Sequence, residues 1–300
     1  MNDADFEEFR DSLLDYINNF IDVLSMPNGD WTVKGFIDIA KNIYTISVDT
    51  KVISKILELM LFPIIQQFAR ERGIQIELSE AQNFYPDMTL IFPDGTKAAL
   101  DVKSTYRVSP TRVSGFTLGA FTGYFRFRDS AKNIVYPYQE YAKHYVLGVI
   151  YTKQEELIDE NRIYTIDDLE EILSVIRDFE IVLHEKYQIA NDSPGSGNTK
   201  NIGSTKSIEE LRNGMGRFAA QGIEIFDDYW MHYMTNDMAR RAELAEPLYR
   251  NLHEYLTYRG MNQNPRIIAE PGEPYVASMQ LVLPQTEDRP RFPSTRFQGS

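Results

Sequence analysis

Two strand-like runs joined by an Asp-Gly turn constrain the fold of this chain more than any other feature. The runs are residues 89–92 and 97–102, and the dipeptide Asp94-Gly95 between them is typical of a tight connection between antiparallel strands. Such a hairpin would bring Asp87, at the start of the first strand, close to Asp101 on the second strand.

The same hairpin predicts a site for metal-dependent phosphodiester chemistry. Asp101 and Lys103 are two residues apart, so on a strand their side chains point to the same face. A hard divalent cation prefers carboxylate oxygens, and a lysine can serve an attacking water or the charge that develops on a phosphate. The pattern alone fits a second interpretation equally well, namely an exposed turn aspartate beside an ordinary strand salt bridge.

Length and composition exclude several other classes of protein. With 300 residues, 43% of them hydrophobic, the chain can form one large domain or two modest ones. It contains no cysteine, which excludes disulfides and thiolate metal sites, and its four histidines lack the spacing of a zinc site. The N-terminus is acidic, and no apolar run approaches membrane-spanning length, so we expect a cytoplasmic protein.

The net charge of −13 is unusual for a protein that binds nucleic acid, so its distribution matters. Residues 1–30 hold eight acidic residues and one basic residue, and residues 155–180 hold ten acidic and two basic residues. Residues 97–143, around the candidate site, instead hold eight basic and three acidic residues. Contacts with phosphates need a locally basic surface, and this stretch supplies one.

Hydrophobic periodicity predicts helices on both sides of the hairpin in the sequence. Residues 5–24 form an amphipathic helix whose apolar stripe must be buried against the core or against a partner subunit. A second apolar helix at 51–72 begins at an Asp49 or Thr50 N-cap and is interrupted at Pro63. We further predict strands at 133–136, 145–151 and 181–184, a short acidic helix at 166–178, a loop at 191–204 and mostly helical structure at 207–259.

Glu58 lies in the middle of the apolar stretch 56–62, where the burial of a lone carboxylate would be costly. One interpretation is that Glu58 lies at the edge of the apolar helix face. The other is that it reaches toward the same cation as Asp87 and Asp101, since clustered carboxylates tolerate one another best beside a divalent cation.

Residues 195–204, rich in glycine, serine and asparagine, are the second candidate site. They lack the G-K-[ST] ending of a phosphate-binding loop, which excludes an ATP site of that kind. The stretch can be a flexible connector. Alternatively, its glycines allow the backbone to approach base edges, and Asn198 and Asn201 offer the donor and acceptor pair that suits adenine in the major groove.

Together these stretches resemble the type II restriction endonucleases of the EcoRV type, within the PD-(D/E)xK nuclease superfamily. The similarity is collinear over roughly residues 30–260. The stretches that carry it are residues 47–54, 58–59, 63–65, 82–87, 101–106, 116–119, 132–137 and 195–204.

The resemblance implies an α/β protein with a restriction-endonuclease-like fold, in which helices flank a mixed central β-sheet, and it implies a homodimer. The chain would then consist of an N-terminal amphipathic helix at 1–30 that contacts the second subunit, an endonuclease domain at 31–260 with its recognition loop at 191–204, and a proline-rich C-terminal extension at 261–300.

The resemblance also implies roles for individual residues. Asp87, Asp101 and Lys103 match the catalytic motif, Glu58 matches an auxiliary helix carboxylate, and the three acidic residues would bind Mg²⁺. The residues expected to contact DNA are Gly195, Gly197, Asn198, Thr199 and Asn201 in the recognition loop, Gln82 and Asn83 at the minor groove, and Thr105 and Lys132 at the backbone.

The implied reaction is Mg²⁺-dependent cleavage of both strands of a short palindromic DNA site, leaving 5′-phosphates. The best single expectation for the site is GATATC with a blunt cut. A companion DNA methyltransferase would act on the same site without forming a stable complex. Two alternatives stay open, namely a sequence-specific DNA-binding protein of the same fold without cleavage and a structure-specific DNA nuclease.

Overall fold

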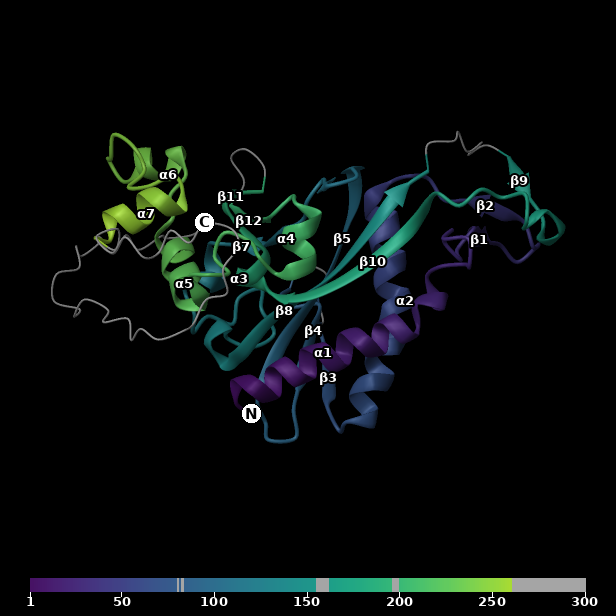
Figure 1. The fold of residues 1–300 in the computed structure, drawn as a ribbon, viewed down its shortest axis with the longest axis horizontal. Helices are drawn as coiled ribbons and strands as arrows, with labels where there is room; N and C mark the ends of the chain where they lie inside the picture. The colour runs from purple at the N-terminus through teal and green to yellow at the C-terminus, as the bar shows by residue number, and fades with distance from the viewer. Residues whose placement is uncertain (80, 82–83, 155–161, 196–199, 261–300) are drawn as a thin grey trace.

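A mixed β-sheet forms the centre of the computed structural model, which describes residues 1–79, 81, 84–154, 162–195 and 200–260 (Figure 1). The strand order is β10-β8-β5-β4-β3. β5 and β8 run parallel, and the other neighbours in this order are antiparallel. These strands are β3 (Gln75–Leu78), β4 (Met88–Ile91), β5 (Lys97–Ser109), β8 (Tyr141–Lys153) and β10 (Ile176–Glu185). The expected α/β fold with a mixed central sheet is confirmed.

The apolar side chains of β8 explain its place inside the sheet. Leu147 and Val149 belong to the hydrophobic core on one face, whereas Val146 and Ile150 belong to the core on the other. All four are fully buried. A strand that is apolar on both faces is stable only where both faces are covered, which is the usual setting of parallel pairing.

Two helices, α1 (Asp3–Asn19) and α2 (Thr50–Glu71), cover one face of the sheet (Figure 1). The Asp49 carboxylate accepts hydrogen bonds from the N–H groups of Lys51 and Val52 in the first turn of α2, and Asp49 is therefore the predicted N-cap. The predicted interruption at Pro63 is wrong, because α2 continues through it. The carbonyl that loses its helical partner belongs to Leu59, which is 60% exposed and can bind water.

α2 is also long and apolar enough, by length and composition, to cross a membrane. In the structure, however, it is a core helix. Ile53, Leu57, Leu61 and Phe68 are buried in the hydrophobic core shared with α1 and the sheet. The apolar character of α2 therefore has a packing explanation.

The apolar stripe of α1 is buried in the core of its own chain. Phe6, Phe9, Leu13 and Ile17 are buried, and the Phe9 ring lies 5.8 Å from that of Phe68 on α2. Of the two expected locations for this stripe, the structure shows the core. A dimer contact through α1 would have to use its polar face, and it stays a prediction.

The other face of the sheet carries a second hydrophobic core and the C-terminal helices. Phe226, Tyr229 and Trp230 are buried there with Val146 and Ile150 of β8. The mostly helical structure predicted for 207–259 is confirmed. The helices on this side are α3 (Lys186–Ile189), α4 (Ile208–Asn213), α5 (Gly222–His232), α6 (Asn236–Arg241) and α7 (Leu252–Tyr258).

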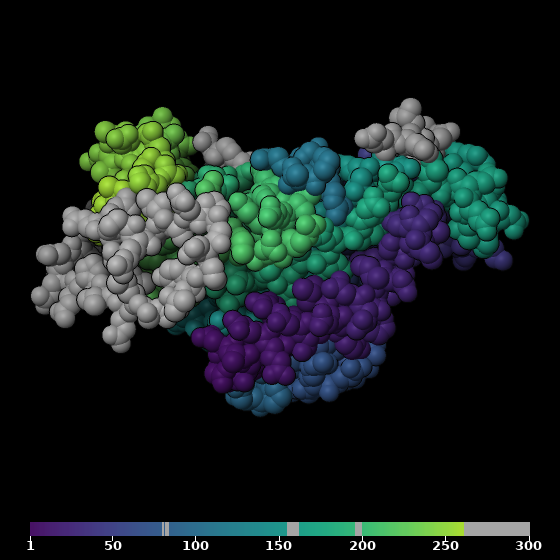
Figure 2. Space-filling model, in the orientation of Figure 1, coloured from purple at the N-terminus to yellow at the C-terminus, as the bar shows by residue number. Residues whose placement is uncertain are grey.

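Two small sheets lie beside the central one. The first contains β11 (Ala190–Pro194), β12 (Asn201–Ser204) and β7 (Thr117–Ala120). The second contains β1 (Gly35–Ile37), β2 (Ile43–Thr45) and β9 (Ile163–Tyr164), and it projects from the main body as a lobe (Figures 1 and 2). The remaining short elements are β6 (Arg112–Val113), η1 (Ile21–Val23), η2 (Gly123–Phe125), η3 (Tyr138–Glu140) and η4 (Ile166–Asp168).

Three further element predictions are wrong in detail. The acidic helix predicted at 166–178 is limited to η4, because Ile176 and Arg177 already pair with β8. The strand predicted at 133–136 is reduced to one bridge between Ile134 and Tyr85. The loop predicted at 191–204 forms strands at both ends, because β12 pairs with β11 and β7.

The burial of α1 predicts a large effect of core truncation on stability. Leu13→Ala should lower the free energy of unfolding by about 2–5 kcal/mol, because Leu13 is fully buried and the truncation leaves a cavity. Urea unfolding followed by circular dichroism measures the change. The control Glu7→Ala, on the exposed face of α1, should change it by less than about 0.5 kcal/mol. Equally small losses in both variants would contradict the packing.

Candidate active site

The β4–β5 hairpin brings Asp87, Asp101 and Lys103 together. The antiparallel register of the two strands places Asp87 opposite Asp101. The Asp87 N–H donates to Asp101 Oδ1 at 3.1 Å, and the Val102 N–H donates to Asp87 Oδ2 at 2.9 Å. Lys103 Nζ lies 3.0 Å from Asp87 Oδ2 and 3.4 Å from Asp101 Oδ2. The predicted proximity of these three side chains is therefore observed.

The Lys103 ammonium offsets the charges of two carboxylates that are held close together. Asp101 exposes only 5% of its side chain, whereas Asp87 exposes 30%. Burial and the nearby charge of Asp101 raise the pKa of Asp87, and Lys103 opposes this rise. Burial would lower the pKa of Lys103, but the two carboxylates outweigh burial and raise it. Lys103 therefore stays protonated between them.

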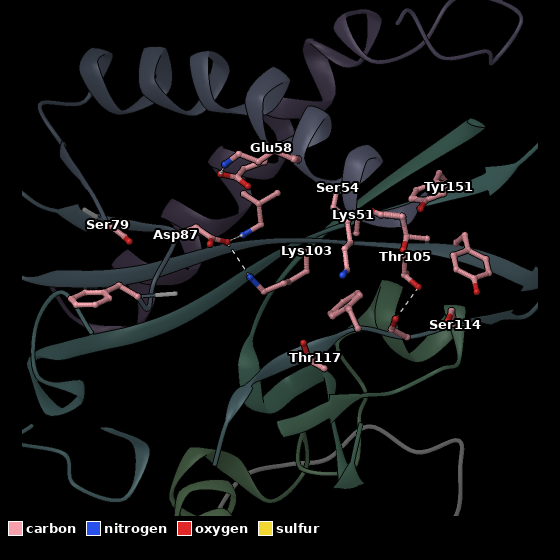
Figure 3. A pocket seen from close by; sticks show the side chains of 18 of the residues that line it. Lys51, Ser54, Glu58, Ser79, Asp87, Lys103, Thr105, Ser114, Thr117 and Tyr151 are labelled. Carbon is pink, nitrogen blue, oxygen red and sulfur yellow. Dashed lines mark hydrogen bonds and ion pairs between the residues drawn. The ribbon is translucent and has the colours of Figure 1, made fainter. Parts of the chain in front are cut away.

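A wide cleft of about 810 Å³ opens beside these residues (Figure 3). The first half of α2 contributes one part of its lining, and β5 and residues 114–117 contribute another. Most of the lining residues are polar or charged, and they include Thr50, Lys51, Ser54, Ser79, Ser104, Thr105, Ser114 and Thr117. The Ser54 and Ser104 hydroxyls are 2.7 Å apart and connect α2 to β5. A polar cleft of this size suits an extended, charged substrate.

Glu58 lines the same cleft but has a different partner (Figure 3). Lys55 Nζ, from the preceding turn of α2, lies 2.6 Å from Glu58 Oε1. Among the residues that the structure describes, no three histidine or acidic side chains converge as a metal-binding group. Glu58 is thus in the cleft but not brought together with Asp87 and Asp101, and its metal-binding role stays a prediction.

Asp87 and Asp101 are the residues that could hold a divalent cation. Their charges repel each other, and a hard cation would stabilise both ionised forms. Mg²⁺ keeps several of its waters and commonly binds through only one or two protein carboxylates. The donor set present here therefore fits Mg²⁺ without a third protein ligand.

The second candidate site lies on the β11–β12 hairpin. The Gly195 N–H donates to the Asn201 carbonyl at 3.0 Å and closes the loop between the strands. A Cβ atom at Gly203 would lie 2.8 Å from Gly195 Cα, a distance that only glycine permits. Gly195 and Asn201, the first and last of the predicted base-contacting residues in the loop 191–204, thus lie opposite each other on the hairpin. The other predicted members of this loop, Gly197, Asn198 and Thr199, lie outside the described residues.

The remaining predicted DNA contacts differ in their positions. Thr105 lines the cleft, but it is buried and its hydroxyl donates to the Gly115 carbonyl at 3.2 Å. Lys132 is exposed and is not among the described residues that line the cleft. Gln82 and Asn83 lie outside the described residues.

Sequence reasoning missed three lysines near the site. Lys51 and Lys55 line the cleft with Glu58. Lys51 and Lys55 are four residues apart, and Lys55 and Glu58 are three apart, so the sequence of this amphipathic helix already indicated that the three side chains share one face. Lys186 is buried on the side of the sheet that faces the second core, near Asp101. No local pattern in the sequence marks Lys186, because its neighbours come from distant segments.

Comparisons with known proteins identify the family of this chain. The family model described as restriction endonuclease EcoRV matches residues 27–260. The chain is 36% identical over 248 residues to the type II restriction enzyme EcoRV of Escherichia coli, covering 81% of this chain and 98% of that protein. Among solved structures, NlaIV restriction endonuclease matches with 13% identity over 83% of this chain and 95% of that chain, and its TM-score of 0.40 is too low to carry an argument. The sequence matches show that the chain belongs to the EcoRV family of type II restriction endonucleases.

Proposed function

We propose that this endonuclease cleaves both strands of duplex DNA at a short palindrome with Mg²⁺ as its cofactor. The observation that carries the proposal is the convergence of Asp87, Asp101 and Lys103 beside a wide polar cleft. A protein that only binds DNA gains nothing from two carboxylates at this place, because without a metal they repel phosphates. The arrangement therefore favours cleavage over binding alone.

Each of the three residues has a distinct task in the proposed reaction. Asp87 and Asp101 would hold Mg²⁺, which supplies Lewis-acid stabilisation of the charge on the scissile phosphate. Lys103 would donate a hydrogen bond to the attacking water or to a phosphate oxygen and stabilise the added negative charge. In-line attack of water and departure of the 3′ oxygen leave a 5′-phosphate and a 3′-hydroxyl. We assign Glu58 an auxiliary metal-binding role, which requires its ion pair with Lys55 to open.

For the recognition site we propose GATATC with a blunt central cut. The 36% identity to the Escherichia coli enzyme and the resemblance of residues 195–204 to the recognition loop of the family support this choice. The closely spaced backbones at Gly195 and Gly203 form a narrow hairpin that can approach base edges in the major groove. Gln82 and Asn83 are proposed minor-groove contacts, and Thr105 and Lys132 are proposed backbone contacts.

A palindromic site is matched by a two-fold symmetric homodimer, and the β1–β2–β9 lobe offers a surface for the second subunit. Phe36 pairs with Tyr44, and Tyr44 pairs with Ile163. These three apolar side chains therefore form a row across the lobe, and they are 52%, 44% and 57% exposed. Exposed apolar rows of this kind mark interaction surfaces.

Two proposals concern the cellular setting. A companion methyltransferase would protect host DNA by modifying the same site, and no stable complex between the two enzymes is needed. The endonuclease would act in the cytoplasm, where its DNA substrate lies.

Cleavage of a long duplex of known sequence tests the proposed specificity. With Mg²⁺, the protein should give discrete, blunt-ended fragments whose ends fall within GATATC, and EDTA should abolish them. Sequencing of the ends identifies the cut. A smear would contradict sequence specificity, and intact DNA that is nevertheless retarded in a gel would favour a binding protein without cleavage.

Lys103→Ala should separate DNA binding from cleavage. We expect binding to a GATATC duplex in Ca²⁺ to stay within about threefold of wild type, while the Mg²⁺-dependent cleavage rate falls by about 10²–10³-fold. Fluorescence anisotropy and single-turnover cleavage measure the two quantities. The control Lys97→Ala removes a lysine at the far end of β5 and should cleave normally. Retained cleavage by Lys103→Ala would remove this lysine from the mechanism.

Tyr44→Glu should weaken the homodimer, because it places a charge in the apolar row of the lobe. In sedimentation velocity the variant should be a monomer at concentrations where wild type is a dimer. Tyr44→Phe keeps the ring and serves as the matched control. A dimeric Tyr44→Glu protein would place the subunit contact elsewhere.

A further inference from the structure

Among the lysines and arginines that the structure describes, Lys186 alone is buried. It is 2% exposed, and among the described residues it forms no salt bridge with Asp101, Asp227 or Asp87, whose charges favour its ammonium form. A buried lysine without such a partner destabilises a fold relative to an apolar side chain of similar length. Stability therefore does not explain why a lysine stands at this position.

The ammonium of Lys186 lies against the residue that leads into the catalytic motif. Its Nζ atom is 4.1 Å from the centre of the Tyr85 ring, a cation–π contact in a water-poor environment. Tyr85 is held by a 2.7 Å hydrogen bond between its hydroxyl and His144 Nδ1, and its ring stacks on Tyr124. Asp87 follows only two residues later, so the position of Tyr85 fixes the path of the chain into Asp87.

The backbone of Lys186 leads into the other candidate site. Lys186 begins α3, and α3 continues directly into β11 of the recognition hairpin. The Thr205 N–H, just after β12, donates to the Ile189 carbonyl of α3 at 2.8 Å. A Cβ atom at Gly119 of β7, the strand paired with β12, would lie 3.6 Å from Lys186 Nζ. Lys186 thus stands where the hairpin sheet meets the catalytic strands.

We infer that Lys186 is a positioning residue that connects the base-reading hairpin to the catalytic carboxylates through Tyr85. Binding of the hairpin to its cognate bases determines the position of α3. The position of α3 in turn determines where the Lys186 ammonium lies, and the ammonium holds Tyr85 at the start of the segment that leads to Asp87. The inference rests on the proposed function, because it presupposes that the hairpin reads DNA. Although burial lowers the pKa of Lys186 to about 8, the ammonium form still predominates at neutral pH, and Asp101 favours it.

Lys186→Met tests this connection, because it removes the charge and keeps a side chain of similar length. The single-turnover cleavage rate on a GATATC duplex in Mg²⁺ should fall by about 100-fold, the usual loss from a small misplacement of reacting groups. Binding of the same duplex in Ca²⁺, measured by anisotropy, should stay within about threefold. The ratio of cleavage rates between GATATC and a duplex with one altered base pair should shrink, which a purely structural role would not produce.

Lys97→Met is the matched control. Lys97 also lies over a tyrosine ring, that of Tyr136 at 4.5 Å, but it is at the opposite end of β5 from the site. This variant should bind and cleave like wild type. Tyr85→Leu should reproduce the loss seen in Lys186→Met, and the double variant should lose little more, since both changes break the same contact.

The outcomes are distinguishable. Intact DNA with the wild-type protein would refute the proposed function and the inference with it. Normal fragments with wild type, together with a Lys186→Met rate within about threefold and an unchanged ratio, would refute the inference alone. A parallel loss of folding, binding and cleavage would assign Lys186 a structural role. If Lys186→Met does not fold, Tyr85→Leu tests the inference on its own, because it breaks the same contact with the lysine in place: cleavage should be about 100-fold slower with binding in Ca²⁺ within about threefold.

Discussion

The pairing of β4 with β5 is the constraint on which the rest of the structure depends. Its register holds the Asp87 and Asp101 carboxylates close together, where their charges oppose folding. The Lys103 ammonium between them offsets part of that repulsion, and the backbone N–H groups of Asp87 and Val102 offset more. The hairpin stays formed because its other residues, such as Leu90 and Leu100, are buried in the core beneath α1 and α2. Hydrophobic burial thus stabilises an electrostatically unfavourable site.

The two faces of the central sheet have different structural roles. One face, covered by α1 and α2, supplies most of the apolar packing around the hairpin and one wall of the cleft. The other face carries α3, the β11–β12 hairpin and the C-terminal helices, and its core contains the tyrosines around Lys186. Because β5 lies between both cores, its catalytic segment has neighbours in both layers: α2 lines the cleft beside Lys103, and Lys186 lies near Asp101. The candidate active site is therefore at the junction of the two layers.

How much was predictable from the sequence depended on the range of the interactions. The meeting of Asp87, Asp101 and Lys103 was predictable, since an Asp-Gly turn and strand alternation are local signals. The prediction of a helix at 166–178 was wrong because Ile176 pairs with β8, a strand that is not adjacent in the sequence. The pairing of β12 with β7 and the burial of Lys186 are likewise long-range results. The ion pair of Lys55 with Glu58 is local, yet the sequence alone did not separate it from a metal-directed carboxylate.

Under the proposal that the β11–β12 hairpin reads DNA, the contact between Gly195 and Gly203 has a consequence for changing the specificity of this enzyme. The two glycines and the pairing of β12 with β7 fix the ends of the strands β11 and β12, and we call residues 196–199, between these ends, the cassette for sequence variation. Libraries that vary residues inside the cassette leave its anchors intact, whereas a side chain at Gly203 forces the strands apart before any new base contact can form. Directed evolution of this protein should therefore vary the sequence of the cassette and keep Gly195 and Gly203 unchanged.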